Sequence, residues 1–308
     1  MNIRIGKKTF LLASALLAAT AAQAQQQRPD FSKVEIKTTK LADNFYTLEG
    51  QGGAVSVLTG PDGVLLVDSQ FAPLTEKLVA AIKEVSDKPI RFLVNTHVHG
   101  DHTGGNENFA KLGAAIFARE QLRDRLVHPN PAADGTPGKP AAPEALPVVT
   151  YDDSVTIHID GENVRLLPIR SAHTDGDTLV SFPEHDILAV GDFYRSVGYP
   201  IADLNNGGSL NGLLEALRVT IDRAGPNTKI IPGHGPIVDR NAVIAQRDLI
   251  IAYRDKVSAL VGQNKTLEEV LAAKITADTD AQIPQSAQSA DRFVKWLYSE
   301  VKAAKLKA

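Results

Sequence analysis

Four side chains that can bind a metal ion lie within six residues of the chain: His97, His99, Asp101 and His102. Three of the chain's eight histidines fall in this segment. Because successive side chains of an extended segment alternate between its two faces, His97 and His99 point the same way and can share one ion. Imidazole nitrogen and carboxylate oxygen are donors that zinc accepts. The cluster therefore predicts a metal site, and the alternative of solvated loop residues does not account for so dense a group.

The second half of the cluster predicts a second ion. His102 is adjacent to Asp101 and lies beyond the flexible Gly100, so its side chain aims away from the ion held by the first two histidines. Gly104 and Gly105 then allow a tight turn into a following helix.

Further donors are expected at strand ends in the second half of the chain, because open α/β proteins place their sites there. Three residues follow short apolar runs in that half: His173, Asp192 and His234. With the first cluster they make seven donors, whereas one tetrahedral zinc accepts about four. We therefore expect two ions that share one bridging residue. The natural division is His97, His99 and His173 on one ion, Asp101, His102 and His234 on the other, and Asp192 between them.

The elements that position these donors form two similar halves, as judged from hydrophobic periodicity and turn residues. In the first half we expect strands 45–48, 54–59 and 64–68, a helix 73–86, a strand 91–95, a helix beginning near 104, and a strand 114–117. In the second half we expect strands 155–159, 164–169, 179–182 and 187–190, a helix 209–223, and a strand 229–231. The C-terminal segment 266–308 is expected to be helical, with a helix starting near 266 and another over 287–305, after a helix over 242–261.

Residues 128–147 are expected to form a long loop over the site. Six prolines fall in this segment, and each fixes φ and removes a hydrogen-bond donor. Regular structure is therefore not expected there.

Residues 1–24 have the pattern of a signal peptide, with basic residues, an apolar stretch from Phe10 to Ala19, and a small-residue end at Ala24. The apolar stretch is shorter than the roughly 20 residues of a membrane-spanning helix, so no anchor is expected after cleavage. Residues 25–308 are then expected to form a single domain that is periplasmic or secreted.

Composition narrows the classes of function. Cleavage after Ala24 leaves 30 basic and 36 acidic residues, a net charge of −6, with no basic stripe of the kind that binds nucleic acid. The chain has no cysteine, which excludes disulfides and thiolate ligands. Any metal must therefore be held by nitrogen and oxygen. The expected partner is a small-molecule substrate, and the sequence leaves the oligomeric state open.

The seven donors, in this order, resemble the pattern of the metallo-β-lactamase superfamily, and the resemblance spans residues 45–254. It implies an α+β fold, a four-layer αβ/βα sandwich in which two sheets from the two half-repeats pack face to face. It also implies that Asp68, at the end of its strand, supports the site without binding the metal. An aspartate at the bridging position, Asp192, makes this site more similar to the sites of glyoxalase II and lactonases than to those of true β-lactamases. The segment 198–209 resembles an exported branch of the superfamily.

The chemistry implied is hydrolysis. We expect two Zn²⁺, with iron or manganese as alternatives for the same donors. The pair would supply a bridging hydroxide near neutral pH, and Asp101 would orient it. Tyr194, Arg195 and Tyr199 are candidates for the substrate pocket.

No protein general acid is evident, which favours esters, thioesters and lactones over amides as substrates. Hydrolysis of β-lactam antibiotics is the alternative activity. A non-catalytic zinc-binding protein is a further alternative, although a structural site would close around four ligands. A di-iron oxidoreductase is disfavoured, because a carboxylate in place of a histidine of the first cluster and a flavin domain are both missing from the sequence.

Overall fold

A computed structural model describes residues 30–131 and 135–307. Within these residues the first sheet contains β1 Lys37–Ala42, β2 Phe45–Glu49, β3 Val55–Gly60, β4 Gly63–Val67, β5 Ile90–Val94, β6 Ala115–Arg119 and β7 Val149–Tyr151. These strands lie side by side in chain order. Neighbours from β1 to β4 are antiparallel, whereas β4, β5, β6 and β7 run parallel. The sheet therefore changes from hairpins to crossover connections at β4.

The second sheet comes from the second half of the chain. Its strands are β8 Val155–Ile159, β9 Glu162–Pro168, β10 Thr178–Phe182, β11 Ile187–Gly191 and β12 Lys229–Pro232. The spatial order is β12-β11-β10-β9-β8. Strands β8 to β11 are antiparallel neighbours and β11 pairs with β12 in parallel. Each half of the chain thus builds one sheet.

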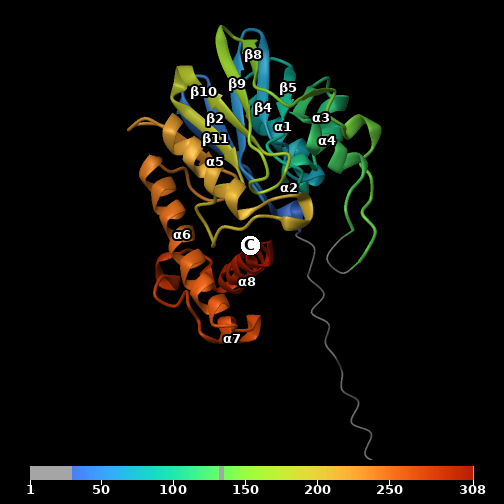
Figure 1. Ribbon diagram of the computed structural model, residues 1–308. Helices are drawn as coiled ribbons and strands as arrows, with labels where there is room; N and C mark the ends of the chain where they lie inside the picture. The colour runs from blue at the N-terminus through green and yellow to red at the C-terminus, as the bar shows by residue number, and fades with distance from the viewer. Residues whose placement is uncertain (1–29, 132–134, 308) are drawn as a thin grey trace, which may run out of the picture. The chain divides into compact units, whose positions relative to one another are not determined.

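Helices cover the outer faces of both sheets (Figure 1). The described α-helices are α1 Thr75–Lys83, α2 Gly100–Thr103, α3 Asn106–Lys111, α4 Glu120–Val127, α5 Leu210–Arg223, α6 Arg240–Gly262, α7 Leu267–Ala272 and α8 Ser286–Lys307. Short 3-10 turns occur at η1 Phe31–Lys33, η2 Ala72–Leu74, η3 Pro143–Ala145, η4 Pro183–His185, η5 Leu204–Asn206 and η6 Asp280–Gln282.

Three buried clusters define the layers. One lies between the sheets and includes Phe45 of β2 and Phe182 of β10, whose rings meet edge to face. A second joins the outer face of the first sheet to α1 and α3. A third joins the outer face of the second sheet to α5, α6, α7 and α8. This confirms the four-layer αβ/βα sandwich.

Burial of the strands follows from these layers. All five residues of β4 are buried, as expected for a strand covered on both faces. The edge strand β8 instead alternates, with Ile157 and Ile159 buried and Thr156 and His158 exposed. Helix α5 is preceded by Ser209, whose side chain accepts a hydrogen bond from the Gly212 amide, a usual N-cap arrangement.

The structure departs from the sequence-based elements in a few places. Strands β1 and β7 and helix α4 were not expected. The helix expected near 104 is two short helices, α2 and α3, separated at Gly104–Gly105. A Cβ at either glycine would overlap a backbone carbonyl, of Gly100 or of Ser69, so only glycine allows this close approach.

The proline-rich segment 128–147 contains only the short turn η3 among its described residues. It contacts Asn205 near the site through two hydrogen bonds: Asn130 donates to the Asn205 carbonyl at 2.6 Å, and the Asn205 side-chain amide donates to the Pro131 carbonyl at 3.2 Å.

The predicted signal peptide, residues 1–24, lies outside the described residues. Residues from Phe31 onward belong to one compact unit. In the part of the chain that the structure describes, no helix is both long and apolar enough to cross a membrane.

Candidate metal centre

Strand ends deliver the predicted donors. His97 and His99 follow β5, and the short helix α2 presents Asp101 and His102 immediately afterwards. In the second sheet, three strands end just before the other donors: β9 before His173, β11 before Asp192 and β12 before His234. The seven residues therefore meet at one edge of the two-sheet core.

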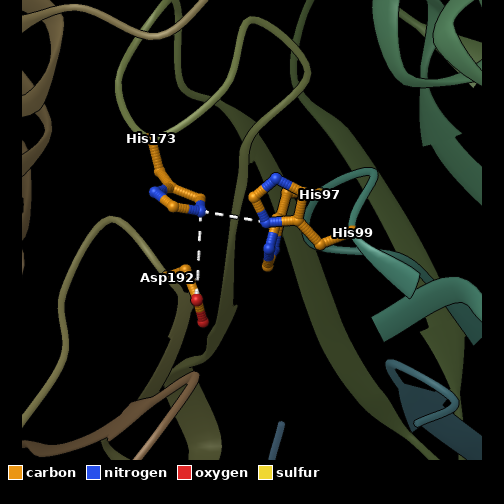
Figure 2. Close-up of side chains that lie close together, drawn as sticks. All are labelled: His97, His99, His173 and Asp192. Carbon is orange, nitrogen blue, oxygen red and sulfur yellow. Dashed lines mark hydrogen bonds and ion pairs between the residues drawn. The ribbon is translucent and has the colours of Figure 1, made fainter. Parts of the chain in front are cut away.

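The donors fall into two groups that match the predicted division. His97, His99, His173 and Asp192 form the first (Figure 2). Asp101, His102 and His234 form the second. Within each group one potential ligand atom per residue lies within 4.8 Å of all the others, so each group could hold one metal ion.

The carboxylate of Asp192 lies between the two groups. Its Oδ1 atom is 3.3 Å from Nε2 of His102, and its Oδ2 atom is 3.3 Å from Nε2 of His234. The same Oδ2 is 3.9 Å from Nε2 of His173 in the first group. Asp192 is therefore placed as a bridging ligand would be.

Unpaired buried atoms show that the residues fit metal ions. Within the described residues, His97 Nε2, His102 Nε2 and Asp192 Oδ1 are buried and have no hydrogen-bond partner. Leaving such an atom unpaired costs about 1–3 kcal/mol. Three such atoms among neutral-nitrogen and anionic-oxygen donors are explained by cations held in the two groups, with His97 in the first, His102 in the second and Asp192 between them.

Hydrogen bonds on the far side of each ring fix which nitrogen faces the centre. His102 Nδ1 lies 2.7 Å from Oδ2 of Asp68, and the Thr96 amide donates to Oδ1 of the same carboxylate at 2.7 Å. His173 Nδ1 lies 2.8 Å from the carbonyl of Ile201. Asp68 thus lies behind His102 and outside both donor groups, as predicted for a supporting residue. Such outer partners fix the tautomer and orientation of metal-binding histidines.

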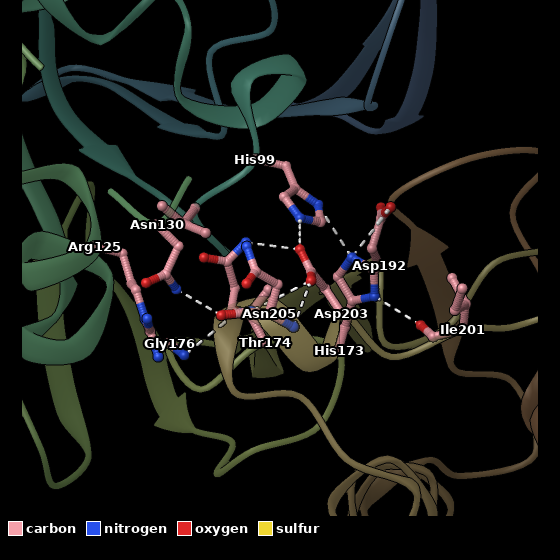
Figure 3. Close-up of polar contacts among 12 residues, drawn as sticks. His99, Arg125, Asn130, His173, Thr174, Gly176, Asp192, Ile201, Asp203 and Asn205 are labelled. Atoms are coloured by element: carbon pink, nitrogen blue, oxygen red, sulfur yellow. Dashed lines mark hydrogen bonds and ion pairs between the residues drawn. The ribbon is translucent and has the colours of Figure 1, made fainter. Parts of the chain in front are cut away.

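The ring of His99 has the opposite orientation, with Nδ1 and not Nε2 facing the centre. Its Nε2 atom lies 2.8 Å from Oδ2 of Asp203, which leaves Nδ1 facing His173 Nε2 at 3.2 Å (Figure 3). When the outer nitrogens donate hydrogen bonds to Asp203 and to the Ile201 carbonyl, the two nitrogens that face each other both present lone pairs. Two lone pairs at this distance repel unless a cation lies between them.

Charges in the cluster suit metal binding. Burial lowers the pKa of His173 to about 4, and burial also holds the pKa of His97 well below its usual range. Burial acts to raise the pKa of Asp192, but the charge of His102 outweighs it and lowers that pKa well below normal. Two imidazoles are thus neutral and the Asp192 carboxylate is ionised, which are the protonation states that metal ligands require.

The pKa of His102 is shifted in the opposite direction from those of His97 and His173. Burial acts to lower its pKa, but the charges of Asp68 and Asp192 raise it well above the usual value. A metal ion at its Nε2 would therefore replace a proton.

A cleft of about 530 Å³ opens onto both groups, a size within the usual range for small-molecule sites. Its lining residues are His99, Asp101, His173, Asp192, Arg195, Ile201, Ala202, Asp203, Leu204, Asn205, His234 and Arg292.

Of the three pocket candidates, only Arg195 lines the cleft. The prediction for Tyr194 and Tyr199 was wrong. Tyr194 is 4% exposed and Tyr199 is 1% exposed, and both belong to the core beneath α6 and α8. The Tyr199 hydroxyl donates to Asp280 Oδ1 at 2.8 Å, so the segment after Asp192 turns these rings inward.

A comparison with protein-family models decides the family. Residues 48–236 match the model of the metallo-beta-lactamase superfamily, a range that contains all seven donors and Asp68. The chain belongs to this superfamily. Arg292, which α8 brings to the cleft, lies beyond the matched range.

Relatives of this superfamily member have different activities. A linear primary-alkylsulfatase of Pseudomonas sp. is 35% identical over 78 residues, 23% of this chain and 15% of the relative. A metallo-beta-lactamase type 2 of Elizabethkingia meningoseptica is 25% identical over 221 residues, 68% of this chain and 82% of the relative. A hydroxyacylglutathione hydrolase of Polaromonas sp. is 26% identical over 163 residues, 53% of this chain and 55% of the relative.

The chain thus spans a small part of the alkylsulfatase and about half of the hydroxyacylglutathione hydrolase. Among solved structures, a metallo-beta-lactamase from Pontibacter korlensis has a TM-score of 0.55 at 21% identity, covering 70% of this chain and 98% of that one. This likeness shows the fold.

Sequence reasoning missed two groups around the superfamily site. Sequence reasoning assigned no role to Asp203, because its contact with His99 depends on how the loop 201–208 folds back. Asp177 is buried and accepts hydrogen bonds from the amides of His173 and Thr174. Burial raises its pKa to about 7. Its position four residues after His173 was the available signal.

Proposed function

We propose that this protein is an exported hydrolase that holds two zinc ions and cleaves an acyl bond in an ester, a thioester or a lactone. The observation that carries the proposal is the position of Asp192 between two complete donor groups. The open cleft beside them supports catalysis, because a purely structural zinc site is closed by its protein ligands.

His97, His99 and His173 would hold one ion, Asp101, His102 and His234 the other, and Asp192 both. Bound zinc supplies a nucleophile near neutral pH by lowering the pKa of water, and polarises the substrate carbonyl. Iron or manganese could occupy the same donors.

Asp101 is the residue that we assign to catalysis. Its Oδ2 atom lies 3.1 Å from Nε2 of His234 and its side chain lines the cleft. Burial acts to raise the pKa of Asp101, but the hydrogen bond with His234 and the charge of His102 lower it to about 2. An ionised carboxylate at this place would accept a hydrogen bond from the attacking water and orient it towards the carbonyl.

The leaving group sets the substrate class. None of the described residues that line the cleft is a lysine, tyrosine or cysteine, and its histidines belong to the donor groups. A leaving group that needs no proton from the protein, such as a thiolate or a stabilised alkoxide, is therefore favoured over an amine. The similarity to a hydroxyacylglutathione hydrolase supports this choice.

Hydrolysis of β-lactam antibiotics is the second candidate. It is favoured by the similarity to a metallo-beta-lactamase over 82% of that relative's length. We rank it lower because the bridging position is an aspartate, and because opening a lactam requires an amine to leave.

Metal analysis and one substrate panel test the proposal. The purified protein should contain about two zinc ions per chain by elemental mass spectrometry. Parallel rates with a thioester, a lactone, an aryl ester, a cephalosporin and an alkyl sulfate should be highest for the first three. One tightly held ion with no hydrolysis would instead indicate the non-catalytic zinc protein, and a dominant cephalosporin rate would indicate a β-lactamase.

Export has its own test. Residues 1–24 are proposed to direct the chain to the periplasm or the medium and to be removed after Ala24. Cell fractionation followed by N-terminal sequencing should recover a chain that starts at Gln25. A cytoplasmic protein that retains residues 1–24 would contradict this part of the proposal.

A further inference from the structure

We propose that Arg195 and Arg292 form an anion-binding subsite in the cleft, so that the preferred substrate carries an oxyanion next to its scissile bond. The inference rests on the proposed function, because it specifies the charge of the substrate that the acyl hydrolase takes. The shared chemistry is that of a carboxylate, a sulfonate or a sulfate.

The two guanidinium groups reach the same cleft from separate parts of the chain. Arg195 lies in the segment after β11, and Arg292 lies in the second turn of α8. Both line the cleft together with Asp192 and His234. The Nη1 atom of Arg195 is 4.0 Å from Oδ2 of Asp192, so a group bound by Arg195 would lie beside the metal centre.

Among the described residues, the only ion pair of these two arginines is the 4.0 Å contact of Arg195 with Asp192. Arg292 has no ion pair or hydrogen bond among them, and the buried Nε atom of Arg195 has no hydrogen-bond partner. The neighbouring carboxylate, Asp192, is already in contact with His102 and His234.

The other acidic groups of the cleft are also engaged. Asp101 contacts His234, and Asp203 contacts His99. Burial and the positive charge of Arg195 lower the pKa of Arg292, and the negative charge of Asp192 offsets this repulsion between the two cations only in part. A bound oxyanion would remove this repulsion.

The fold holds α8 in a fixed position against the loop that follows Asp192. The Tyr199 amide donates to Ser289 Oγ at 2.9 Å, and the Gly198 amide donates to the carbonyl of Pro284 at 2.7 Å. Phe293, next to Arg292, stacks on the Tyr199 ring with 5.0 Å between ring centroids. The backbone that carries Arg292 is therefore fixed by the same segment that carries Arg195.

Guanidinium chemistry sets the class of ligand. Two planar forks of N–H donors match the oxygens of carboxylate and sulfur oxyanions and can bind them in bidentate fashion. Arg292 lies outside the range matched by the family model, so this specificity would be a property of the C-terminal helices of this chain.

A matched pair of substrates tests the subsite by kinetics. The first is a thioester with a carboxylate on the carbon next to the acyl group, and the second is its neutral methyl ester. We expect the wild-type kcat/KM to favour the anionic thioester about tenfold or more, since a charge-assisted bidentate contact is worth about that factor. Arg292→Gln should lower this ratio about tenfold, chiefly through KM, and Arg292→Lys should restore it in part.

Arg254→Gln is the control variant. Arg254 lies on α6, pairs with Asp255 at 2.7 Å, and does not line this cleft. It should leave the ratio unchanged. A wild-type enzyme without preference, or an Arg292→Gln variant that loses both substrates equally, would overturn the proposal.

A binding measurement separates failure of the subsite from failure of the proposed function. Calorimetry on the zinc-loaded protein would compare benzenesulfonate with the neutral phenyl methyl sulfone, and benzoate would serve as the carboxylate arm. We expect the anions to bind about tenfold more tightly than the sulfone, and to lose that advantage in Arg292→Gln. Equal binding of anions and sulfone would reject the subsite, whereas tight anion binding without hydrolysis of any substrate would reject the acyl hydrolase alone.

Discussion

The Nε2 atom of His99 lies 2.8 Å from Oδ2 of Asp203, although the two residues belong to different halves of the chain (Figure 3). The backbone amide of Asp203 also donates to the carbonyl of His173 at 2.7 Å. Its side chain caps η5 by accepting from the amides of Asn205 and Asn206. One loop residue therefore joins two donors of the first group and fixes the loop itself.

Replacing Asp203 should weaken metal binding. Asp203→Ala removes the acceptor that keeps the proton on His99 Nε2, and loss of such a partner typically costs about 10–100-fold in metal affinity. Asp203→Asn should lose less, because its amide oxygen can still accept from His99 and cap η5. Competition with a zinc-binding dye measures the affinity.

The control for Asp203 is Asp255→Ala, which removes an exposed carboxylate on α6 that pairs with Arg254. It should leave zinc affinity unchanged. Wild-type affinity in Asp203→Ala would show that His99 is oriented without this contact.

Gly233 should tolerate no side chain. A Cβ there would overlap Oδ1 of Asp192 and lie 2.9 Å from the carbonyl carbon of Gly191. Gly233→Ala must therefore displace the Asp192 carboxylate, and we expect fewer bound zinc ions and a loss of about 1–3 kcal/mol in the free energy of unfolding. Elemental analysis and urea denaturation measure the two effects.

Gly262→Ala is the matched control, because a Cβ at that position meets no atom within 4 Å. It should keep both zinc ions and the wild-type stability. Full zinc content in Gly233→Ala would argue against Asp192 as the shared ligand.

Replacing Asp68 should weaken metal binding by the second donor group more than by the first. It is buried, and its carboxylate accepts from the Thr96 amide, the Thr96 hydroxyl and His102 Nδ1, each at 2.7 Å. Asp68→Asn can keep its left-handed backbone, with φ of 67°, but its amide can accept on one side only. We expect it to fold and to lose one zinc ion, as measured by elemental analysis.

Asp68→Ala should also lower stability by about 1–3 kcal/mol for each buried donor left unpaired. Two zinc ions in Asp68→Asn would contradict the role of Asp68 in orienting His102.

Removing the metal should destabilise the protein. Ligands that bind only the folded state add about 2.7 kcal/mol to the free energy of unfolding at 100 times their Kd. Treatment with a chelator should therefore lower the melting temperature measured by calorimetry, and added zinc should restore it. An unchanged melting temperature would mean that the unpaired atoms of His97 and His102 are not satisfied by metal.

The division of the donors was predictable because it depends on local rules. Side-chain alternation puts His97 and His99 on one face, and an apolar strand before each of His173, Asp192 and His234 puts them at one edge of the core. Most elements were predictable for the same reason. Strand β1 was missed because its first four residues, 37–40, are polar and no residue of the strand is buried. Such a pattern belongs to an edge strand that local periodicity does not reveal.

The outer contacts were not predictable because they depend on tertiary packing. Asp203 and Arg292 reach the cleft only when the loop 201–208 folds back and α8 packs on the second sheet. The prediction that Tyr194 and Tyr199 line the substrate pocket was wrong for the converse reason. They are close to Asp192 in sequence, but the chain turns their rings into the core.

The core position of Tyr199 gives a test of that correction. Its hydroxyl lies 2.7 Å from Thr279 Oγ1 and 2.8 Å from Asp280 Oδ1. Tyr199→Phe should lower the free energy of unfolding by about 1–3 kcal/mol, because buried partners lose a hydrogen bond, and should retain both zinc ions. Tyr46→Phe is the control, since its hydroxyl is exposed and donates only to the Asp43 carbonyl at 3.2 Å. Urea denaturation measures the stability of both variants. A Tyr199→Phe protein that keeps wild-type stability but no longer hydrolyses substrate would show that Tyr199 contributes to the substrate pocket.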